Sequence, residues 1–208
     1  MKFFFGLDLG QSVDYTALVI AERLKADKPH YHLRHLERFP LGTPYPEIVA
    51  NVKSLLVNPM FARKTVLVVD ATGVGAPVLD LFHGAQLPCS IYGIYIHGGD
   101  VVTREGSHLR VPKRDLVSVV QVLLQSGRLK IAESLPEAKT LVKELLNFRV
   151  KIDPVTSHDS YAAWRENIHD DLTLATALAC WLAEKVEVEI PLCAPLIEGL
   201  TKVNQWRF

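Results

Sequence analysis

The stretch FFFGLDLGQS (residues 3–12) sets the fold, because an apolar run carries a carboxylate, Asp8, in its last positions. The run Lys2–Leu9 predicts a buried strand, and Gly6 and Gly10 remove side-chain bulk on either side of Asp8. A buried carboxylate without a partner is costly, so Asp8 needs a cation, a cage of hydrogen bonds or solvent at the strand end. The plainer alternative is an aspartate that caps the turn at Gly10.

The remaining pattern predicts an α/β protein with a mixed sheet. Strands at Tyr15–Arg23 and Tyr31–Phe39 follow the first one over short connections, which predicts an antiparallel meander of three strands. Helices and strands then alternate; the expected elements are Glu47–Leu56, Lys64–Asp70, Ala76–His83, Ser90–His97, Val111–Gln125, Leu135–Leu146 and a helix from about His169. This order predicts helices on both faces of the sheet.

The composition argues against a secreted, disulfide-linked or membrane-spanning protein. The chain has 208 residues, of which 49% are hydrophobic, and its 23 basic and 23 acidic side chains cancel. Three cysteines without metal-site spacing predict reduced thiols, and no signal peptide or membrane span is predicted, so we expect a cytoplasmic protein. We expect one domain over residues 1–186 and a C-terminal tail over residues 187–208, with no structure assigned to the tail.

A second acid repeats the arrangement of the first. In VLVVDATGVGAP (residues 66–77), Asp70 closes an aliphatic run, and Gly73 and Gly75 form the turn into the next helix. Ligands of α/β proteins gather at such carboxyl ends of strands. The alternative is that Asp70 or Thr72 only caps that helix.

A third acidic position opens a late apolar helix in HDDLTLATALACWL (residues 169–182). Asp170 and Asp171 would lie in the first turn, where the helix dipole favours negative charge, so a capping role is one interpretation. Asp171 also continues the core-facing stripe of Ala175 and Leu178, which directs it toward the strand ends that carry Asp8 and Asp70. Converging carboxylates repel one another, and Mg²⁺ or Mn²⁺ is the usual partner of such a cluster.

These motifs resemble the RNase H-like nuclease domain of large terminase subunits from tailed bacteriophages. The resemblance rests on GLDLG (residues 6–10), VDATGVG (69–75) and HDDLTLATALA (169–179), and it extends to the stretches 111–132 and 148–171. It implies an endonuclease that cuts concatemeric double-stranded viral DNA during genome packaging, with little sequence specificity. In that family's scheme, Asp8 bridges two divalent ions, Asp70 and Asp171 hold one each, and Asp170 is a second ligand or a cap.

The resemblance also concerns partners. Large terminase subunits usually carry an ATPase motor before the nuclease, and this sequence has no Walker A motif. We therefore expect an excised domain, a separately encoded subunit or a prophage relic, with a separate packaging ATPase or portal as candidate partners. Between residues 104 and 151 the chain has ten basic and five acidic side chains. Within that stretch Arg104, Arg110, Lys113 and Arg114 are candidates for gripping DNA phosphates, although a solvated face with ordinary ion pairs explains them equally well.

Other functions remain open. A Holliday-junction resolvase of the RuvC type shares the sheet and the acids, but such enzymes commonly carry glutamate where this chain has Asp70. A nucleotide-binding module of the actin and sugar-kinase type shares the GLDLGQS stretch, but such proteins need two subdomains. A non-catalytic protein that binds DNA without cutting it is the third alternative.

Overall fold

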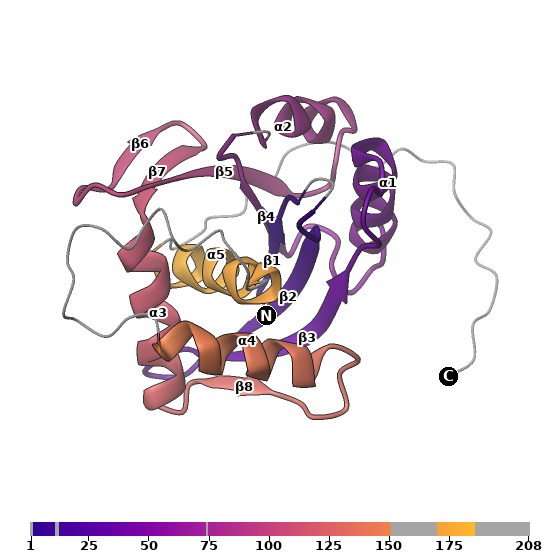
Figure 1. Cartoon of the computed structure of the whole chain (residues 1–208). Coiled ribbons are helices and arrows are strands. Elements are labelled where there is room, and N and C mark those ends of the chain that lie inside the picture. The colour runs from indigo at the N-terminus through magenta and orange to yellow at the C-terminus, as the bar shows by residue number, and fades with distance from the viewer. Residues whose placement is uncertain (1, 11–12, 74, 151–169, 186–208) are drawn as a thin grey trace.

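The computed structural model describes residues 2–10, 13–73, 75–150 and 170–185. They form an eight-stranded sheet with the order β6-β7-β5-β4-β1-β2-β3-β8 (Figure 1). The strands are β1 (Lys2–Asp8), β2 (Ala17–Leu24), β3 (His30–Arg38), β4 (Thr65–Asp70), β5 (Ser90–His97), β6 (Thr103–Glu105), β7 (His108–Pro112) and β8 (Leu129–Ile131). The helices of the described residues are α1 (Tyr45–Leu56), α2 (Gly75–Gly84), α3 (Lys113–Gln125), α4 (Ala138–Val150) and α5 (Asp171–Lys185).

The sheet mixes two kinds of pairing around strand β1. Strands β1, β2 and β3 form the antiparallel meander expected from the sequence. On its other side β1 runs parallel to β4, and the parallel series continues through β5 and β7, while β6 turns back antiparallel to β7 and β8 runs parallel to β3. The carboxyl ends of β1, β4, β5 and β7 therefore lie along one edge of the sheet.

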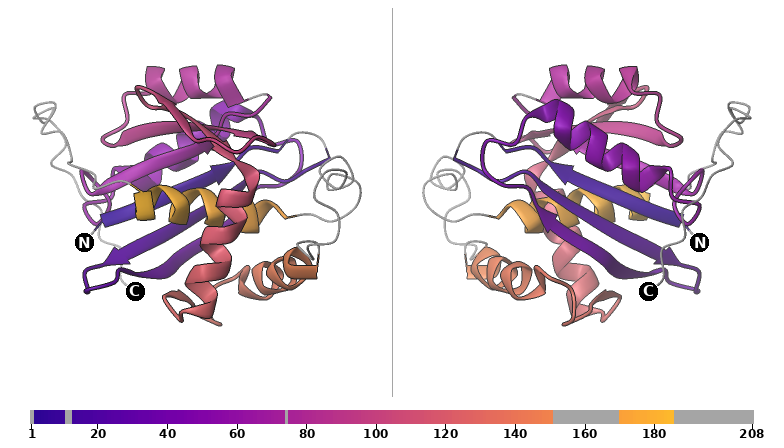
Figure 2. Two further views of the ribbon diagram at one scale, coloured as in Figure 1. Left: turned by 90° about the vertical axis from the view of Figure 1, so that its left-hand side faces the viewer. Right: turned by 90° about the vertical axis from the view of Figure 1, so that its right-hand side faces the viewer.

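Each face of the sheet has its own hydrophobic core. Phe3, Phe5 and Leu7 of β1 pack with α1 and α2, whereas Phe4 belongs to the core that contains α3, α4 and α5. The two panels of Figure 2 show this division, with α3 and α5 before the strands in the left panel and α1 before them in the right. The predicted α/β architecture, a mixed sheet covered by helices on both faces, is confirmed.

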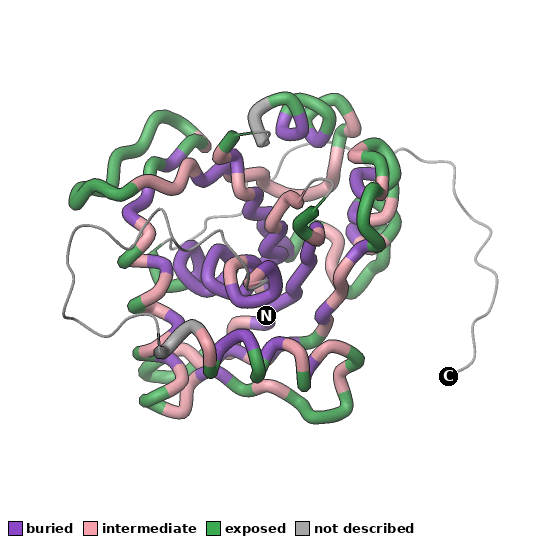
Figure 3. Tube along the Cα trace, in the orientation of Figure 1, coloured by how far each residue is buried: buried purple, intermediate pink, exposed green. Residues whose placement is uncertain are grey.

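Helix α5 is the most deeply buried helix in the described part of the chain. Twelve of its fifteen residues are buried, and the helix lies at the centre of the molecule in Figure 3. It lies close on β1, since a Cβ atom at Gly6 would come within 1.9 Å of the carbonyl oxygen of Ala175. Ala179 also faces Gly6, so small residues on both elements permit this approach. The close approach sets where the first turn of α5 lies along β1.

Three short strands were not expected from the sequence. Strands β6 and β7 form a hairpin at one edge of the sheet and β8 lies at the other (Figure 1). Because Val111 and Pro112 belong to β7, helix α3 begins at Lys113 instead of at Val111. The stretch 151–169, which includes most of the hairpin region named in the resemblance, and the expected tail 187–208 lie outside the described residues. Among the helices described, none is long and apolar enough to span a membrane.

Candidate metal centre

Asp8 and Asp70 end neighbouring parallel strands. Leu7 of β1 pairs with Val69 of β4, so the two aspartates follow one step later at the same edge of the sheet. Both side chains share the face of the sheet that α5 covers, because Phe4 and Val68, at even spacing before them, belong to the core on that side. The register of β1 and β4 thus brings together two acids that are 62 positions apart in the sequence.

Helix α5 adds two further acids to this edge. Ala175 lies over Gly6, and Asp171 precedes Ala175 by four residues, about one helical turn. The helix begins at Asp171, which is only 4% exposed. Asp170 occupies the N-cap position, because its carbonyl oxygen accepts the first helical hydrogen bond from the Leu174 amide at 2.8 Å. Asp170 thus stands at the N-cap position, and whether its carboxylate acts as a cap or as a ligand stays a prediction.

The pKa of Asp8 is affected by its burial and by the charges of the other acids. Burial raises its pKa well above the ordinary value of 3.8, and the negative charges of Asp70, Asp171 and Asp170 raise it further, in that order. The exposed Asp14, which the sequence did not single out, adds to this effect. Within the described residues, no three acidic, histidine or cysteine side chains are already arranged as a formed metal-binding group. The charges of Asp70, Asp171 and Asp170 all act on Asp8, and carboxylate oxygens are the hard donors that Mg²⁺ and Mn²⁺ prefer.

Asp70 also shapes the turn that follows β4. One carboxylate oxygen accepts a hydrogen bond from the Thr72 amide at 2.8 Å, and the Thr72 hydroxyl accepts one from the Ile96 amide at 2.8 Å. Helix α2 begins at Gly75, and this bond orders the turn that leads into it. A carboxylate has several acceptor positions, so one such bond is compatible with a second role as a ligand.

A buried glutamate of α4 lies at the start of α5. Glu144 is 5% exposed, and its Oε2 accepts a hydrogen bond from the backbone amide of Thr173 at 2.9 Å. Burial raises the pKa of Glu144 to about 7; the charge of Asp171 adds to this rise, while the Thr173 amide and the charge of Arg38 oppose it. Glu144 could not be singled out from the sequence, because nothing local marks it as different from a surface glutamate. It lies 29 positions before Thr173.

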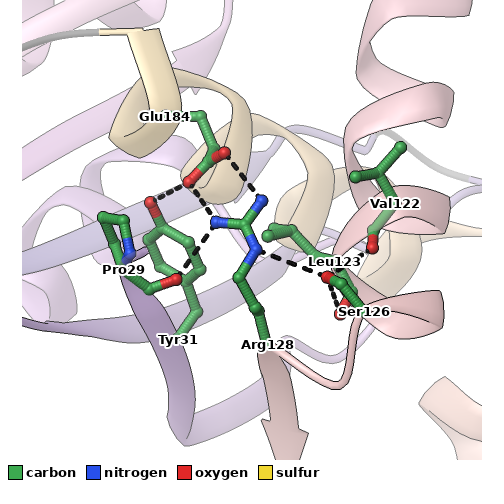
Figure 4. Close-up of polar contacts among 7 residues, drawn as sticks. All are labelled: Pro29, Tyr31, Val122, Leu123, Ser126, Arg128 and Glu184. Atoms are coloured by element: carbon green, nitrogen blue, oxygen red, sulfur yellow. Dashed lines mark hydrogen bonds and ion pairs between the residues drawn. The ribbon is translucent and has the colours of Figure 1, made fainter. Parts of the chain in front are cut away.

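The opposite end of α5 is held by a second polar network, shown in Figure 4. Arg128 donates two hydrogen bonds to the two carboxylate oxygens of Glu184, at 2.9 and 3.0 Å. The Tyr31 hydroxyl donates to Glu184 at 2.5 Å, and Arg128 also donates to the carbonyl oxygen of Pro29. A two-pronged contact of this kind restrains orientation as well as distance. Helix α5 is therefore anchored near both ends.

The candidate phosphate-binding residues do not share one face. Arg104 pairs with Leu109, Leu109 with Ile94 and Ile94 with Asp70, so Arg104 lies in the same row and on the same face as Asp70. Its guanidinium is stacked over the Tyr92 ring, 5.8 Å from the centroid. Arg110 points to the opposite face, because it pairs with Tyr95, which packs in the α1 and α2 core.

The start of α3 lies on the α5 side of the sheet. Lys113 is its first residue, directly after β7 ends at the edge that carries the acids. Arg114 forms an ion pair with Asp100 at 2.5 Å and donates to the Asp100 carbonyl, so part of its charge is neutralised within the protein. Of the four candidates, Arg104 lies on the same face of the sheet as Asp70, Arg110 lies on the opposite face, and Lys113 and Arg114 begin α3 after the end of β7.

Solved structures of a phage terminase nuclease are similar to this chain. The large terminase nuclease of thermophilic phage G20c with bound magnesium superposes with a TM-score of 0.56 at 20% identity, and the same nuclease with bound zinc gives 0.54 at 22%. Both alignments cover 86% of this chain and 79% of the phage nuclease chain. The fold of this chain is that of the RNase H-like terminase nucleases.

A more distant structure agrees with this assignment of the fold. The human cytomegalovirus terminase nuclease domain, soaked in manganese, gives a TM-score of 0.51 at 14% identity, over 88% of this chain and 82% of the viral domain. No protein-family model matches the sequence, and no curated protein is significantly similar to it. The resemblance named from the motifs is therefore matched by structures of terminase nuclease domains, at the level of the fold.

Proposed function

We propose that this chain is a divalent-metal-dependent DNA endonuclease, with Asp8, Asp70 and Asp171 as metal ligands. The observation that carries the proposal is that Asp8 and Asp70 end neighbouring strands at the same edge of the sheet, where the charges of Asp70 and Asp171 raise the pKa of the buried Asp8. Acids in such a cluster repel one another unless a cation lies between them. Mg²⁺ and Mn²⁺ fit this donor set.

The residues have distinct parts in this proposal. Asp8 would serve both ions, and Asp70 and Asp171 would hold one each; the charges of these two acids both act on Asp8. Asp170 acts as the N-cap of α5 and can supply a further oxygen. Divalent ions in a site of this kind lower the pKa of a water and offset negative charge at the scissile phosphate. The protein's own contribution is to fix the carboxylates and to admit the DNA backbone.

The substrate we propose is double-stranded DNA, cut with little sequence dependence. The likeness to terminase nucleases supports concatemeric viral DNA in the cytoplasm of a bacterial host, together with a packaging ATPase or a portal as partners. Arg104 and Lys113 support a path for the duplex on the α5 side of the sheet. Contacts to phosphates position a duplex without reading its sequence.

The test is nicking of supercoiled plasmid by the whole chain with Mg²⁺ or Mn²⁺, compared with excess chelator. We expect cleavage only with the metal, no requirement for ATP, and loss of cleavage in Asp8→Asn and Asp70→Asn. Asp80→Asn, an exposed aspartate on α2, is the matched control and should cut like the wild type. Metal-independent nicking, or normal rates in either site variant, would refute the assignment. A strong preference for four-way junctions over plain duplex would favour a resolvase.

A further inference from the structure

The first turn of α5 receives its cap from another helix. The amide at the third position of a helix normally donates to the side chain of the N-cap residue, which here is Asp170. In this structure that amide, of Thr173, donates to Glu144 of α4 at 2.9 Å instead. The bond joins the turn that carries Asp171 to a separate element of the fold.

Glu144 stands where a charged side chain is costly. It is 5% exposed, Thr173 is fully buried, and the neighbouring Asp171 is 4% exposed. Burying a carboxylate beside another acid destabilises a fold unless specific bonds offset the cost. The geometry shows what Glu144 provides in return: an acceptor oxygen for the backbone amide at the start of α5, two residues from a proposed metal ligand.

We infer that Glu144 is a positioning residue, whose bond to the Thr173 amide holds the Asp171 carboxylate toward Asp8 and so sets the metal affinity of the site. This inference rests on the proposed function. Partners that orient a ligand commonly change metal affinity by about 10-fold to 100-fold when they are removed. The role depends on reach and on an acceptor oxygen, and it does not require the negative charge of Glu144.

Two substitutions separate reach from charge. Glu144→Gln keeps the length and an acceptor oxygen but removes the charge, whereas Glu144→Asp keeps the charge but is one methylene too short to reach Thr173. We expect Glu144→Gln to bind Mn²⁺ within about threefold of the wild type and Glu144→Asp to bind it at least about 10-fold more weakly. Mn²⁺ binding is measured on the whole chain without DNA, by electron paramagnetic resonance of the free ion.

A third variant controls for general loosening of α4. Leu145 is the next residue along α4 and is 8% exposed, within the same core. Leu145→Ala should lower the melting temperature, as removal of a buried side chain does, but leave Mn²⁺ affinity within about twofold of the wild type. Amide hydrogen exchange at Thr173 should accelerate in Glu144→Asp and stay slow in Glu144→Gln.

Cleavage kinetics complete the test. We expect Glu144→Asp to lower kcat at fixed Mn²⁺ with KM for plasmid unchanged, and Glu144→Gln to restore kcat. Wild-type Mn²⁺ affinity in Glu144→Asp, or equal loss in both variants, would overturn the inference and leave the proposed function standing. If the wild type neither binds Mn²⁺ nor cuts DNA, the proposed function itself fails.

Discussion

Asp8 stands at a point of electrostatic repulsion, where burial and the charges of four other aspartates all favour its neutral form. Asp8→Asn removes one of the repelling charges, so in metal-free buffer the free energy of unfolding at pH 7 should rise, by about 1 kcal/mol, a common size for a single substitution. Urea unfolding with chelator present measures the change. Asp80→Asn should leave the stability unchanged, and a less stable Asp8→Asn variant would contradict the repulsion.

The pKa of Glu184 is shifted in the opposite direction to that of Asp8, so the charged form of Glu184 is the one that stabilises the fold. Burial favours its neutral form, but the hydrogen bonds from Arg128 and Tyr31 and the charge of Arg128 outweigh burial and keep its pKa below the ordinary 4.5. A carboxyl with a lowered folded-state pKa stabilises the fold above its unfolded-state pKa, and that stabilisation is lost as the pH falls through the folded-state pKa. The free energy of unfolding should therefore decrease below about pH 4.5.

The variant Glu184→Gln isolates this contribution. Its deficit in stability relative to the wild type should be largest near pH 7 and should shrink as the pH falls, because the wild type then loses the same charge. Urea unfolding across the pH range measures both proteins. Glu133→Gln, at an exposed position, should follow the wild type at every pH. A deficit in Glu184→Gln that is constant with pH would contradict the assignment.

The sequence predicts some residues of the candidate site and not others. Asp8, Asp70 and Asp171 could be singled out because each acid interrupts or adjoins an apolar run, a local signal. Asp14 and Glu144 could not, since Asp14 lies in an exposed loop and Glu144 acquires its position only when α4 packs against α5. Whether the predicted residues bind metal remains a proposal.

At the scale of the elements, the contact between α5 and β1 is the tightest constraint on the site. A Cβ atom at Gly6 would lie 1.9 Å from the Ala175 carbonyl oxygen and 3.1 Å from the Ala179 side chain, so Gly6→Ala must push the helix away. We expect a loss of about 3 kcal/mol in the free energy of unfolding, at the upper end for overpacking. Gly84→Ala, where the added methyl meets nothing within 4 Å, is the matched control and should be close to neutral.

The elements that the sequence predicts are the long and periodic ones. The strands and helices that were predicted have six residues or more and show an apolar run or a repeating pattern, whereas β6 and β8 have three residues each and β7 five. A three-residue strand is too short to show alternation, and its existence depends on the neighbour that it pairs with. The hydrophobic pattern of the sequence therefore could not predict the β6–β7 hairpin at the sheet edge.

For the molecule as a whole, the order of the strands sets the distance between Arg104 and Asp70, which the proposed DNA duplex would have to span. Arg104 is three strands from Asp70 in one row, about 14 Å at the spacing of strands, and a duplex whose grooves are about 6 and 12 Å wide can touch both. Arg104→Ala and Lys113→Ala should each weaken binding to any duplex sequence. Each should also reduce the slope of log affinity against log salt by about 1.

Arg110→Ala is the matched control for these two variants. It removes one positive charge from the same hairpin, but from the face opposite the acids. Fluorescence anisotropy of labelled duplex at several salt concentrations, with chelator to prevent cleavage, measures all three. Equal losses for Arg110→Ala and Arg104→Ala would indicate that only net charge matters and that the duplex does not lie on the α5 side.

The place of α5 in the chain affects when the protein can become active during its synthesis. Three of the neighbouring aspartates, counting Asp14, emerge from the ribosome within the first 70 residues, but Asp170 and Asp171 follow 100 residues later. All eight strands of the described sheet precede α4 in the chain, and the helix that carries Asp171 follows it. A nuclease site of the proposed kind therefore cannot form before synthesis has passed α5.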